Sequence, residues 1–180
     1  MHMDQGKAHL NGHSKPRAQQ SQKNVDYPKL LELGRELLIA IGEDPDREGL
    51  QDTPSRWASW WREFIEYDAG TTDTVFSTVS TDQMVCVSGL RVFSLCEHHL
   101  LPMWCDVAIG YIPIDRILGL SKFARVAQKF AHQLQVQERL AEQIADEISH
   151  LTSTEMLAFE DNCDALSTGE ATNFIGDLFS

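Results

Sequence analysis

The sequence predicts one domain of the α+β class, in which an antiparallel sheet is backed by helices. Two kinds of pattern support this prediction. Apolar residues recur at helical spacing in four segments, and two further runs rich in Val, Ile and Phe have the character of strands. With 180 residues and 42% hydrophobic side chains, the chain is long enough for one globular domain with its own core.

A short arm is expected ahead of this domain. Residues 1–25 are rich in Gln, Lys, Asn, Ser, Gly and His and hold hardly any apolar side chains, so burial cannot offset the entropy lost on ordering. We therefore predict a flexible arm, followed by a domain at residues 26–148.

From Pro28 an apolar stripe predicts a first helix that ends at Gly42. The stripe consists of Leu30, Leu33, Leu37, Leu38 and Ile41.

A second helix is predicted from Thr53, because Thr is a common N-cap and Pro54 then occupies the first helical position. Four aromatic rings share one face of this helix: Trp57, Trp60, Trp61 and Phe64. Such a stripe predicts packing, either within the core of this chain or against a partner subunit.

Residues 83–95 and 103–112 are the predicted strands of an antiparallel hairpin. Alternate residues of the second strand are apolar, which predicts one buried face: Met103, Cys105, Val107, Ile109 and Tyr111. Cys86 and Cys105 lie within these strands and are predicted to be reduced core residues, as free cysteines usually are.

The turn between the strands, residues 96–102, holds four reactive side chains in a row. Cys96 and His99 are three residues apart, so a thiolate and an imidazole can reach one zinc ion. Glu97 and His98 lie between them and can transfer protons. Because a Cys-x-x-His pair is also common by chance, the alternative is a polar loop without metal, but a rigid position between two strands favours a site.

Ser121 is the predicted N-cap of a third helix. Its apolar stripe consists of Phe123, Val126, Ala127, Phe130 and Leu134. Lys122 and Arg125 lie three residues apart in the first turn, where free N–H groups and the helix dipole already attract anions. The pattern predicts a phosphate site, and the alternative is a pair of solubilising surface charges.

A fourth predicted helix carries the stripe Val136, Leu140, Ile144 and Ile148. Gln137 and Glu138 lie off this stripe. Glu138 has two interpretations: it can form an ion pair on the helix surface, or it can accept two hydrogen bonds from the N1 and exocyclic amine of guanine.

Charge limits the partners of the chain. The formal net charge of −12 argues against nonspecific nucleic-acid binding, which needs a basic surface. No apolar run approaches the roughly 18 residues of a membrane helix and no secretory leader pattern is found, so we expect no membrane partner and predict a cytoplasmic location. All 15 Lys and Arg residues lie at or before Arg139, whereas residues 149–180 form an acidic tail.

Several long motifs in this order resemble the GTP cyclohydrolase I family over roughly residues 28–148. They are more specific together than any one of them alone. The motifs are Cys96-Glu97-His98-His99-Leu100-Leu101-Pro102, Ile109-Gly110-Tyr111-Ile112-Pro113, the segments 118–125 and 134–140, and an upstream segment at 43–56.

The resemblance implies the tunnelling fold (T-fold), with an antiparallel sheet backed by helices and an N-terminal helical segment. It also implies a ring-shaped homo-oligomer with active sites at the subunit boundaries. The implied reaction is the zinc-dependent hydrolytic opening of the guanine imidazole ring of GTP. This reaction gives 7,8-dihydroneopterin triphosphate and formate, in the first step of tetrahydrofolate and pterin biosynthesis.

The resemblance implies roles for the residues that match the motifs of the family. Cys96 and His99 would ligate Zn²⁺, and His98 would be the catalytic proton-transfer residue. The substrate-binding residues would be Gln137 and Glu138 for the guanine, and Ser121, Lys122 and Arg125 for the triphosphate.

The sequence departs from the family after Arg139. There the family carries a His-x-Cys motif, which supplies a catalytic His and the third zinc ligand, and then an Arg-Gly motif that binds phosphate. Residues 140–180 contain one His, one Cys and no Arg. Cys163 is the candidate third ligand, although Asp161 replaces the family's His and nearby acids raise the pKa of a thiol.

The tail is either a remnant of the family's last segment or unrelated sequence, and the strands that complete the family's sheet are not predicted in it. An incomplete sheet would leave an edge for a neighbouring chain to cover.

Two functions follow: an active GTP cyclohydrolase I, or a catalytically inactive relative that serves as a nucleotide-binding or ring-assembly module. A nitrile reductase of the same fold is disfavoured, because its cysteine nucleophile motif is not found.

Overall fold

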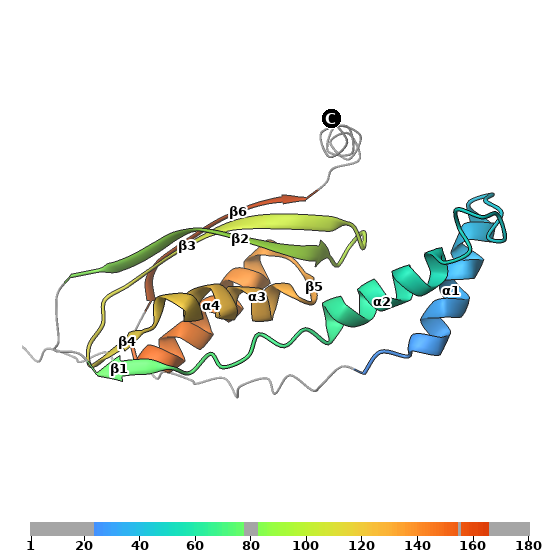
Figure 1. The fold of residues 1–180 in the computed structure, drawn as a ribbon. Coiled ribbons are helices and arrows are strands. Elements are labelled where there is room, and N and C mark those ends of the chain that lie inside the picture. Colours follow the sequence, from blue (N-terminus) through green and yellow to red (C-terminus); the bar gives the residue numbers. More distant parts are fainter. Residues whose placement is uncertain (1–23, 78–82, 155, 166–180) are drawn as a thin grey trace, which may run out of the picture.

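The computed structural model describes residues 24–77, 83–154 and 156–165. The predicted N-terminal arm lies outside the described residues, apart from residues 24 and 25, and so does the end of the acidic tail, residues 166–180. The described chain forms an antiparallel sheet with helices on one face, together with a helical hairpin that projects from one end of the sheet (Figure 1). This arrangement confirms the predicted α+β class.

The projecting hairpin consists of α1 (Tyr27–Ala40) and α2 (Thr53–Ile65). Asp26 caps α1, since its carboxylate accepts a hydrogen bond of 3.0 Å from the backbone N–H of Lys29. Asp52 occupies the N-cap position of α2 without a side-chain capping bond, so the prediction of Thr53 as the cap is wrong by one residue. Pro54 still lies in the first turn, where its missing N–H has no cost.

The aromatic stripe of α2 packs partly on itself and partly on the sheet-forming part of the chain. Trp60 stacks on Phe64 at 5.5 Å between ring centroids and remains 43% exposed. Phe64 and Tyr67 both contact the ring of His132, and the Tyr67 ring stacks on it at 3.7 Å. The Tyr67 hydroxyl also donates a 2.7 Å hydrogen bond to Gln128. These contacts attach the end of α2 to the end of α3.

The main sheet has the strand order β5-β2-β3-β6. β2 (Val85–Cys96) and β3 (Pro102–Tyr111) form the predicted antiparallel hairpin, with a register shift between Val87 and Leu90. β5 (Leu134–Gln135) pairs in parallel with the end of β2. β1 (Val75–Ser77) and β4 (Arg116–Leu118) form a separate two-stranded sheet.

β6 (Met156–Ala165) comes from the acidic tail and pairs with β3 in antiparallel fashion along its length. The tail therefore supplies a strand at an edge of the hairpin that the sequence left without a predicted partner. The boundary predicted between residues 148 and 149 falls inside α4. Strand pairing of this kind joins distant segments and leaves little trace in a short window of sequence.

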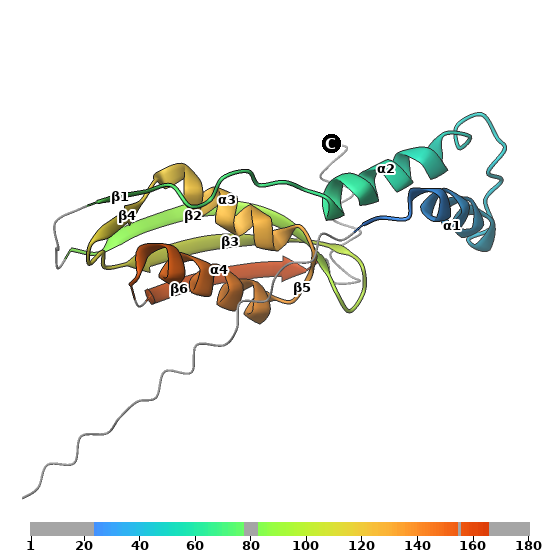
Figure 2. The same ribbon diagram turned by 90° about the horizontal axis from the view of Figure 1, so that it is seen from below.

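The helices α3 (Leu120–Ala131) and α4 (Gln137–Thr152) lie side by side on one face of the sheet (Figure 2). Their predicted apolar stripes enter the core, with two exceptions: Val136 is the N-cap of α4, and Leu134 lies in β5 because α3 ends at Ala131. Gly119, not Ser121, is the N-cap of α3, so that prediction is wrong. The shared core residues include Tyr111, Phe123, Val126, Leu140, Ile144 and Ile148.

The predicted buried face of β3 is confirmed, since all five of its apolar residues are at most 4% exposed. The prediction of two reduced core cysteines is wrong. Cys86 has a free thiol but is exposed, because it lies on the sheet face that α3 and α4 do not cover. Cys105 is fully buried, as predicted, but it is disulfide-bonded.

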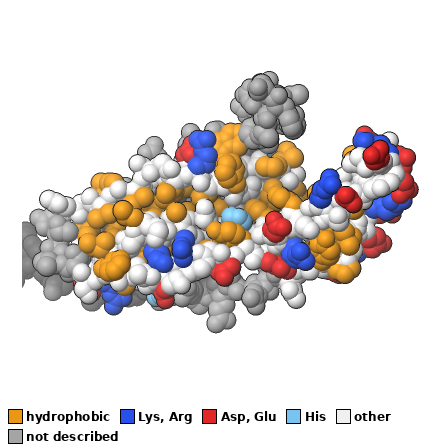
Figure 3. All heavy atoms as spheres, in the orientation of Figure 1, with side chains coloured by type: hydrophobic (Ala, Val, Ile, Leu, Met, Phe, Trp, Pro, Cys, Tyr) orange, Lys and Arg blue, Asp and Glu red, His pale blue; other side chains and the backbone are white. Residues whose placement is uncertain are grey.

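Charged and apolar side chains are unevenly distributed over the surface of the molecule. On the face shown in Figure 3, charged side chains crowd the projecting α1–α2 hairpin, whereas apolar side chains spread across the sheet and its helices. Phe76, Phe93 and Leu120 are between 59% and 72% exposed. Among the described residues, no helix has the length and apolar character that a membrane crossing requires.

Candidate active site at the end of β2

The turn that follows β2 is closed by backbone hydrogen bonds. The N–H of Leu100 donates to the carbonyl of Cys96 at 2.8 Å, and the N–H of Cys96 donates to the carbonyl of Leu101 at 2.9 Å. Leu100 has a φ of +56°, in the left-handed region, which costs an L-residue about 1–2 kcal/mol. Strained backbone of this kind is concentrated at functional sites, where the surrounding structure compensates for it.

The turn brings the two predicted metal ligands together. The Sγ atom of Cys96 lies 3.6 Å from Nδ1 of His99. A tetrahedral zinc ion, with bonds of about 2.3 Å to sulfur and about 2.0–2.1 Å to nitrogen, places these two ligand atoms about 3.6 Å apart. Cys96 is buried and His99 is exposed, so the pair lies at the surface with one side open. The donor atoms and their separation therefore fit zinc.

His98 lies beside this pair. Its Nδ1 atom is 4.0 Å from the Sγ of Cys96, and its ring meets that of His99 edge to face, with 6.2 Å between centroids. The side chain is exposed. An imidazole in this position is close to the predicted metal position and accessible to a substrate.

The base of the turn is attached to β5. Leu95 and Cys96 pair with Leu134 and Gln135, and the N–H of Glu97 donates to the Gln135 carbonyl at 3.0 Å. The Gln135 side chain is fully buried. Its amide nitrogen donates to the Phe130 carbonyl at 2.8 Å and to the Gln143 side chain at 2.7 Å. A buried amide with these partners holds β5, and with it the turn, in one position.

Arg139, in the first turn of α4, joins this helix to the turn. Its guanidinium donates to the Glu97 carboxylate, to the Gln135 side chain at 2.9 Å and to the Leu134 carbonyl at 2.8 Å. The predicted guanine-binding residues Gln137 and Glu138 belong to the same helical turn. Sequence patterns did not identify Arg139 as a site residue, because its partner Glu97 is 42 positions away. The one feature of the sequence that could have pointed to this contact is Glu97, a carboxylate within the Cys-x-x-His turn.

The predicted phosphate-binding residues lie at the start of α3. Lys122 Nζ donates to the Thr71 carbonyl at 2.7 Å, and Arg125 Nη1 contacts the same oxygen at 3.4 Å. Ser121 and Arg125 are exposed. Two cations that converge on one oxygen can also converge on one phosphate. Sequence patterns did not identify the Thr71 loop, which precedes Lys122 by 51 residues.

The site residues thus form two clusters. Cys96, His98 and His99 lie near the C-terminal end of α3, where Ser94 Oγ donates to the Ala131 carbonyl at 2.7 Å. Lys122 lies near the other end of that helix, nine residues earlier, which corresponds to about 14 Å of helix. Within one chain, the structure does not bring the phosphate cluster to the zinc turn.

Cys163 is also remote from the turn. The register places it opposite Cys105, which in turn lies opposite Val92. Two strand spacings and four residues along β2 separate its backbone from that of Cys96, a distance of about 16 Å. The structure therefore does not bring Cys163 to Cys96 within one chain. No group of three or more His, Cys, Asp or Glu side chains placed to hold a metal occurs in the described ranges.

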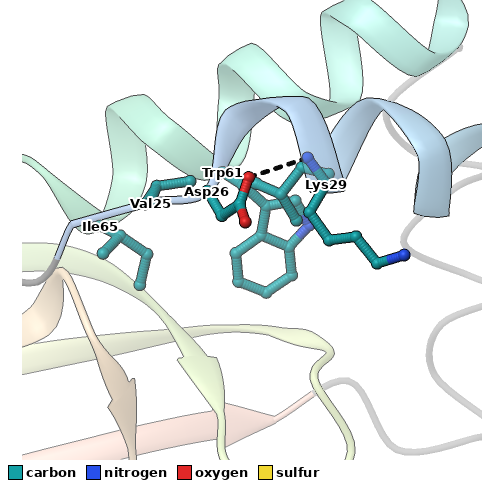
Figure 4. A pocket seen from close by; sticks show the side chains of 6 residues that line it. Val25, Asp26, Lys29, Trp61 and Ile65 are labelled. Carbon is teal, nitrogen blue, oxygen red and sulfur yellow. Dashed lines mark hydrogen bonds between the residues drawn. The ribbon is translucent and has the colours of Figure 1, made fainter.

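Two hollows lie away from the zinc turn. One, of about 250 Å³, lies between the start of α1 and α2, where Trp61 and Ile65 face Val25 and Asp26 (Figure 4). Its lining includes none of the predicted site residues. The other, of about 650 Å³, is polar and is bordered by Thr71 and by His150 of α4. Asp68, Asp73 and Glu147 also line it, so its acidic wall does not suit a phosphate.

The sequence is similar to a known enzyme family. The sequence model described as GTP cyclohydrolase I matches residues 31–164. A protein named GTP cyclohydrolase 1 from Hyperthermus butylicus is 45% identical over 130 residues, which are 72% of this chain and 67% of that protein. Proteins of the same name from a Sulfurihydrogenibium species and from Aquifex aeolicus are 47% and 46% identical, each over 68% of this chain and over 65% and 66% of their own lengths. The chain thus spans about two thirds of the length of the curated relatives that it matches.

An antiparallel sheet with two helices on one face, preceded by a helical hairpin, is the architecture of a tunnelling-fold protein. Within that fold class, the family is identified by the sequence match, which covers residues 31–164. The chain belongs to the GTP cyclohydrolase I family.

Proposed function

We propose that the chain acts as a GTP cyclohydrolase I. It opens the imidazole ring of the guanine of GTP by hydrolysis and yields 7,8-dihydroneopterin triphosphate and formate, as the first step of tetrahydrofolate and pterin biosynthesis. The observation that carries this proposal is the 3.6 Å separation of Cys96 Sγ and His99 Nδ1, which suits two ligands of one zinc ion. Family membership supports the same reaction.

In this proposal Cys96 and His99 hold Zn²⁺. When bound, zinc acts as a Lewis acid that activates water at neutral pH. A catalytic zinc usually has three protein ligands. A third ligand would be water or a residue of a neighbouring chain.

His98 is proposed as the catalytic residue that transfers protons at the purine ring. An imidazole suits this role because its ordinary pKa lies near neutrality. The exposed His98 ring beside the Cys96 thiol supports this assignment, because a base bound over the turn would lie within its reach.

Substrate binding is divided between the starts of two helices. Glu138, with the backbone of Gln137, binds the N1 and exocyclic amine of guanine at the start of α4. Ser121, Lys122 and Arg125 bind the triphosphate at the start of α3, where the helix dipole also favours an anion. The convergence of Lys122 and Arg125 on the Thr71 carbonyl supports the second assignment.

We further propose that the active unit is a ring-shaped homo-oligomer with GTP bound at the boundary between subunits. The two site clusters lie toward opposite ends of α3, so a neighbouring subunit can place its own phosphate cluster beside the zinc turn of the first. The exposed apolar residues Phe76, Phe93 and Leu120 are suited to burial between subunits.

The proposal is tested by measuring zinc content and GTP turnover on the same preparation of the full chain. We expect about one zinc per chain after gentle purification and release of formate from GTP with formation of the fluorescent pterin. Zinc well below one per chain, together with no formate, would overturn the proposal.

A second candidate is a catalytically inactive family member that binds nucleotide or joins ring assemblies. Two observations favour it. Only two of the expected zinc ligands come together in the described chain, and no Lys or Arg follows Arg139 to grip phosphate. Steady pterin formation by this chain alone would exclude the second candidate, whereas tight GTP binding without formate would support it.

A further inference from the structure

We propose that Arg139 is a positioning residue that holds the zinc turn and the guanine-binding turn of α4 in one fixed arrangement. This inference rests on the proposed function for the meaning of the two turns. The contacts that hold the two turns together are between residues that the structure describes.

The contacts of Arg139 reach three separate points. The Nη2 group donates to the Glu97 carboxylate in the zinc turn and to the Leu134 carbonyl in β5. The Nε group donates to the side chain of the fully buried Gln135. One planar guanidinium therefore fixes its own helical turn, β5 and the zinc turn relative to one another. A carboxylate within the metal-binding turn is oriented by this contact, as outer partners of metal sites commonly are.

The Arg139–Glu97 contact is less exposed than an ordinary surface pair. The side chains of Arg139 and Glu97 are 39% and 33% exposed, and Gln135 is not exposed at all. The guanidinium is planar and rigid and can address several acceptors at once. A lysine has a single ammonium group at the end of a flexible stem, so it cannot reproduce the Nε and Nη2 contacts together.

The chain provides a matched control. Arg91 of β2 forms a two-bond ion pair with Asp106 of β3, with distances of 2.7 and 2.6 Å. Their side chains are 57% and 46% exposed, and the pair lies within the hairpin but away from the turn. Replacing Arg91 removes an arginine–carboxylate pair of the same chemistry without touching β5 or α4.

The first experiment uses the full chain without metal or nucleotide and follows amide hydrogen exchange. We expect Arg139→Gln and Arg139→Lys to speed exchange in residues 96–101 by about tenfold or more, while the β3 amides keep their protection. Arg91→Gln should leave residues 96–101 unchanged. Unchanged exchange in that turn for Arg139→Gln would overturn the proposal, and so would an equal loss of protection throughout the sheet, which indicates a general structural role.

The second experiment measures binding of Co²⁺, through the thiolate-to-cobalt absorption band, and binding of GTP. We expect Arg139→Gln to weaken both by about tenfold or more, in the range seen for outer partners of metal sites. In a double-mutant cycle with Glu97→Gln, the double variant should bind Co²⁺ only slightly more weakly than either single variant. Full additivity, or GTP and Co²⁺ binding equal to that of the unchanged chain, would overturn the proposal.

These readouts separate the two proposals. If the chain without substitutions binds GTP and Co²⁺ but releases no formate, the proposed reaction is excluded. The binding data for the Arg139 variants then still decide whether Arg139 has the positioning role. If the unchanged chain binds neither, the hydrogen-exchange result alone decides whether Arg139 holds the turn.

Discussion

Lys129 of α3 and Glu147 of α4 form an ion pair of 2.9 Å at the junction of the two helices that cover the sheet. The Glu147 side chain is 7% exposed and that of Lys129 is 25% exposed. Removing a cation from a buried carboxylate usually costs more than the pair itself contributes, because the carboxylate remains away from water. This pair therefore allows a clear test of how the helices are held together.

Lys129→Met should lower the free energy of unfolding by about 1–3 kcal/mol, the usual cost of removing a charged partner from a buried group. The measurement is urea denaturation of the full chain. Lys29→Met is the matched control, since Lys29 forms an exposed pair with Glu32 at 2.7 Å and should change stability little. Equal effects of the two substitutions would show that the α3–α4 pair is no more important than a surface contact.

Cys96→Ser and His99→Asn should each lower zinc affinity by about 100-fold or more, because each removes a direct ligand, whereas loss of an outer partner alone commonly costs 10–100-fold. The measurement is zinc content after gel filtration in metal-free buffer. Cys86→Ser is the control, since this exposed free thiol lies on β2 ten residues before the turn. Full zinc retention by Cys96→Ser would contradict the assigned ligand pair.

Glu138→Gln should reduce the preference of the chain for GTP over inosine triphosphate by about tenfold or more. Inosine lacks the exocyclic amine, so its binding depends less on a carboxylate that accepts two hydrogen bonds from guanine, and such charged hydrogen bonds contribute about 1.5–3 kcal/mol. Competition binding of the two nucleotides measures the ratio. Glu142→Gln, one turn further along α4, is the control, and an unchanged ratio for Glu138→Gln would exclude a contact with the base.

Lys122→Gln should weaken GTP binding by about tenfold or more while leaving guanosine binding unchanged, because a charge-assisted bond to phosphate is lost. Calorimetry with the two ligands separates the phosphate contact from the base contact. Arg56→Gln on α2, whose side chain is 72% exposed, controls for the loss of one positive charge. Equal weakening of GTP and guanosine would indicate that Lys122 supports the fold instead of the phosphate.

Features that depend on neighbours in the sequence were predictable. Helical and strand periodicity located α1 to α4 and the β2–β3 hairpin, because burial of one face imposes that periodicity. The approach of Cys96 to His99 was predictable for the same reason, since a four-residue turn brings its first and last side chains together. The N-caps of α2 and α3 were each misplaced by one or two residues, because backbone geometry, and not residue type alone, sets a helix start.

Features that join distant segments were not predictable from local patterns. The contact between Glu97 and Arg139 spans 42 residues, that between Lys122 and Thr71 spans 51, and β6 pairs with β3 across two intervening helices. The exposure of Cys86 likewise depends on which sheet face the helices cover. Local spacing thus specified the zinc turn, the phosphate turn and the guanine turn one by one. Their relative positions emerged only on folding, because they depend on the free energy of packing the whole chain and not on any one segment.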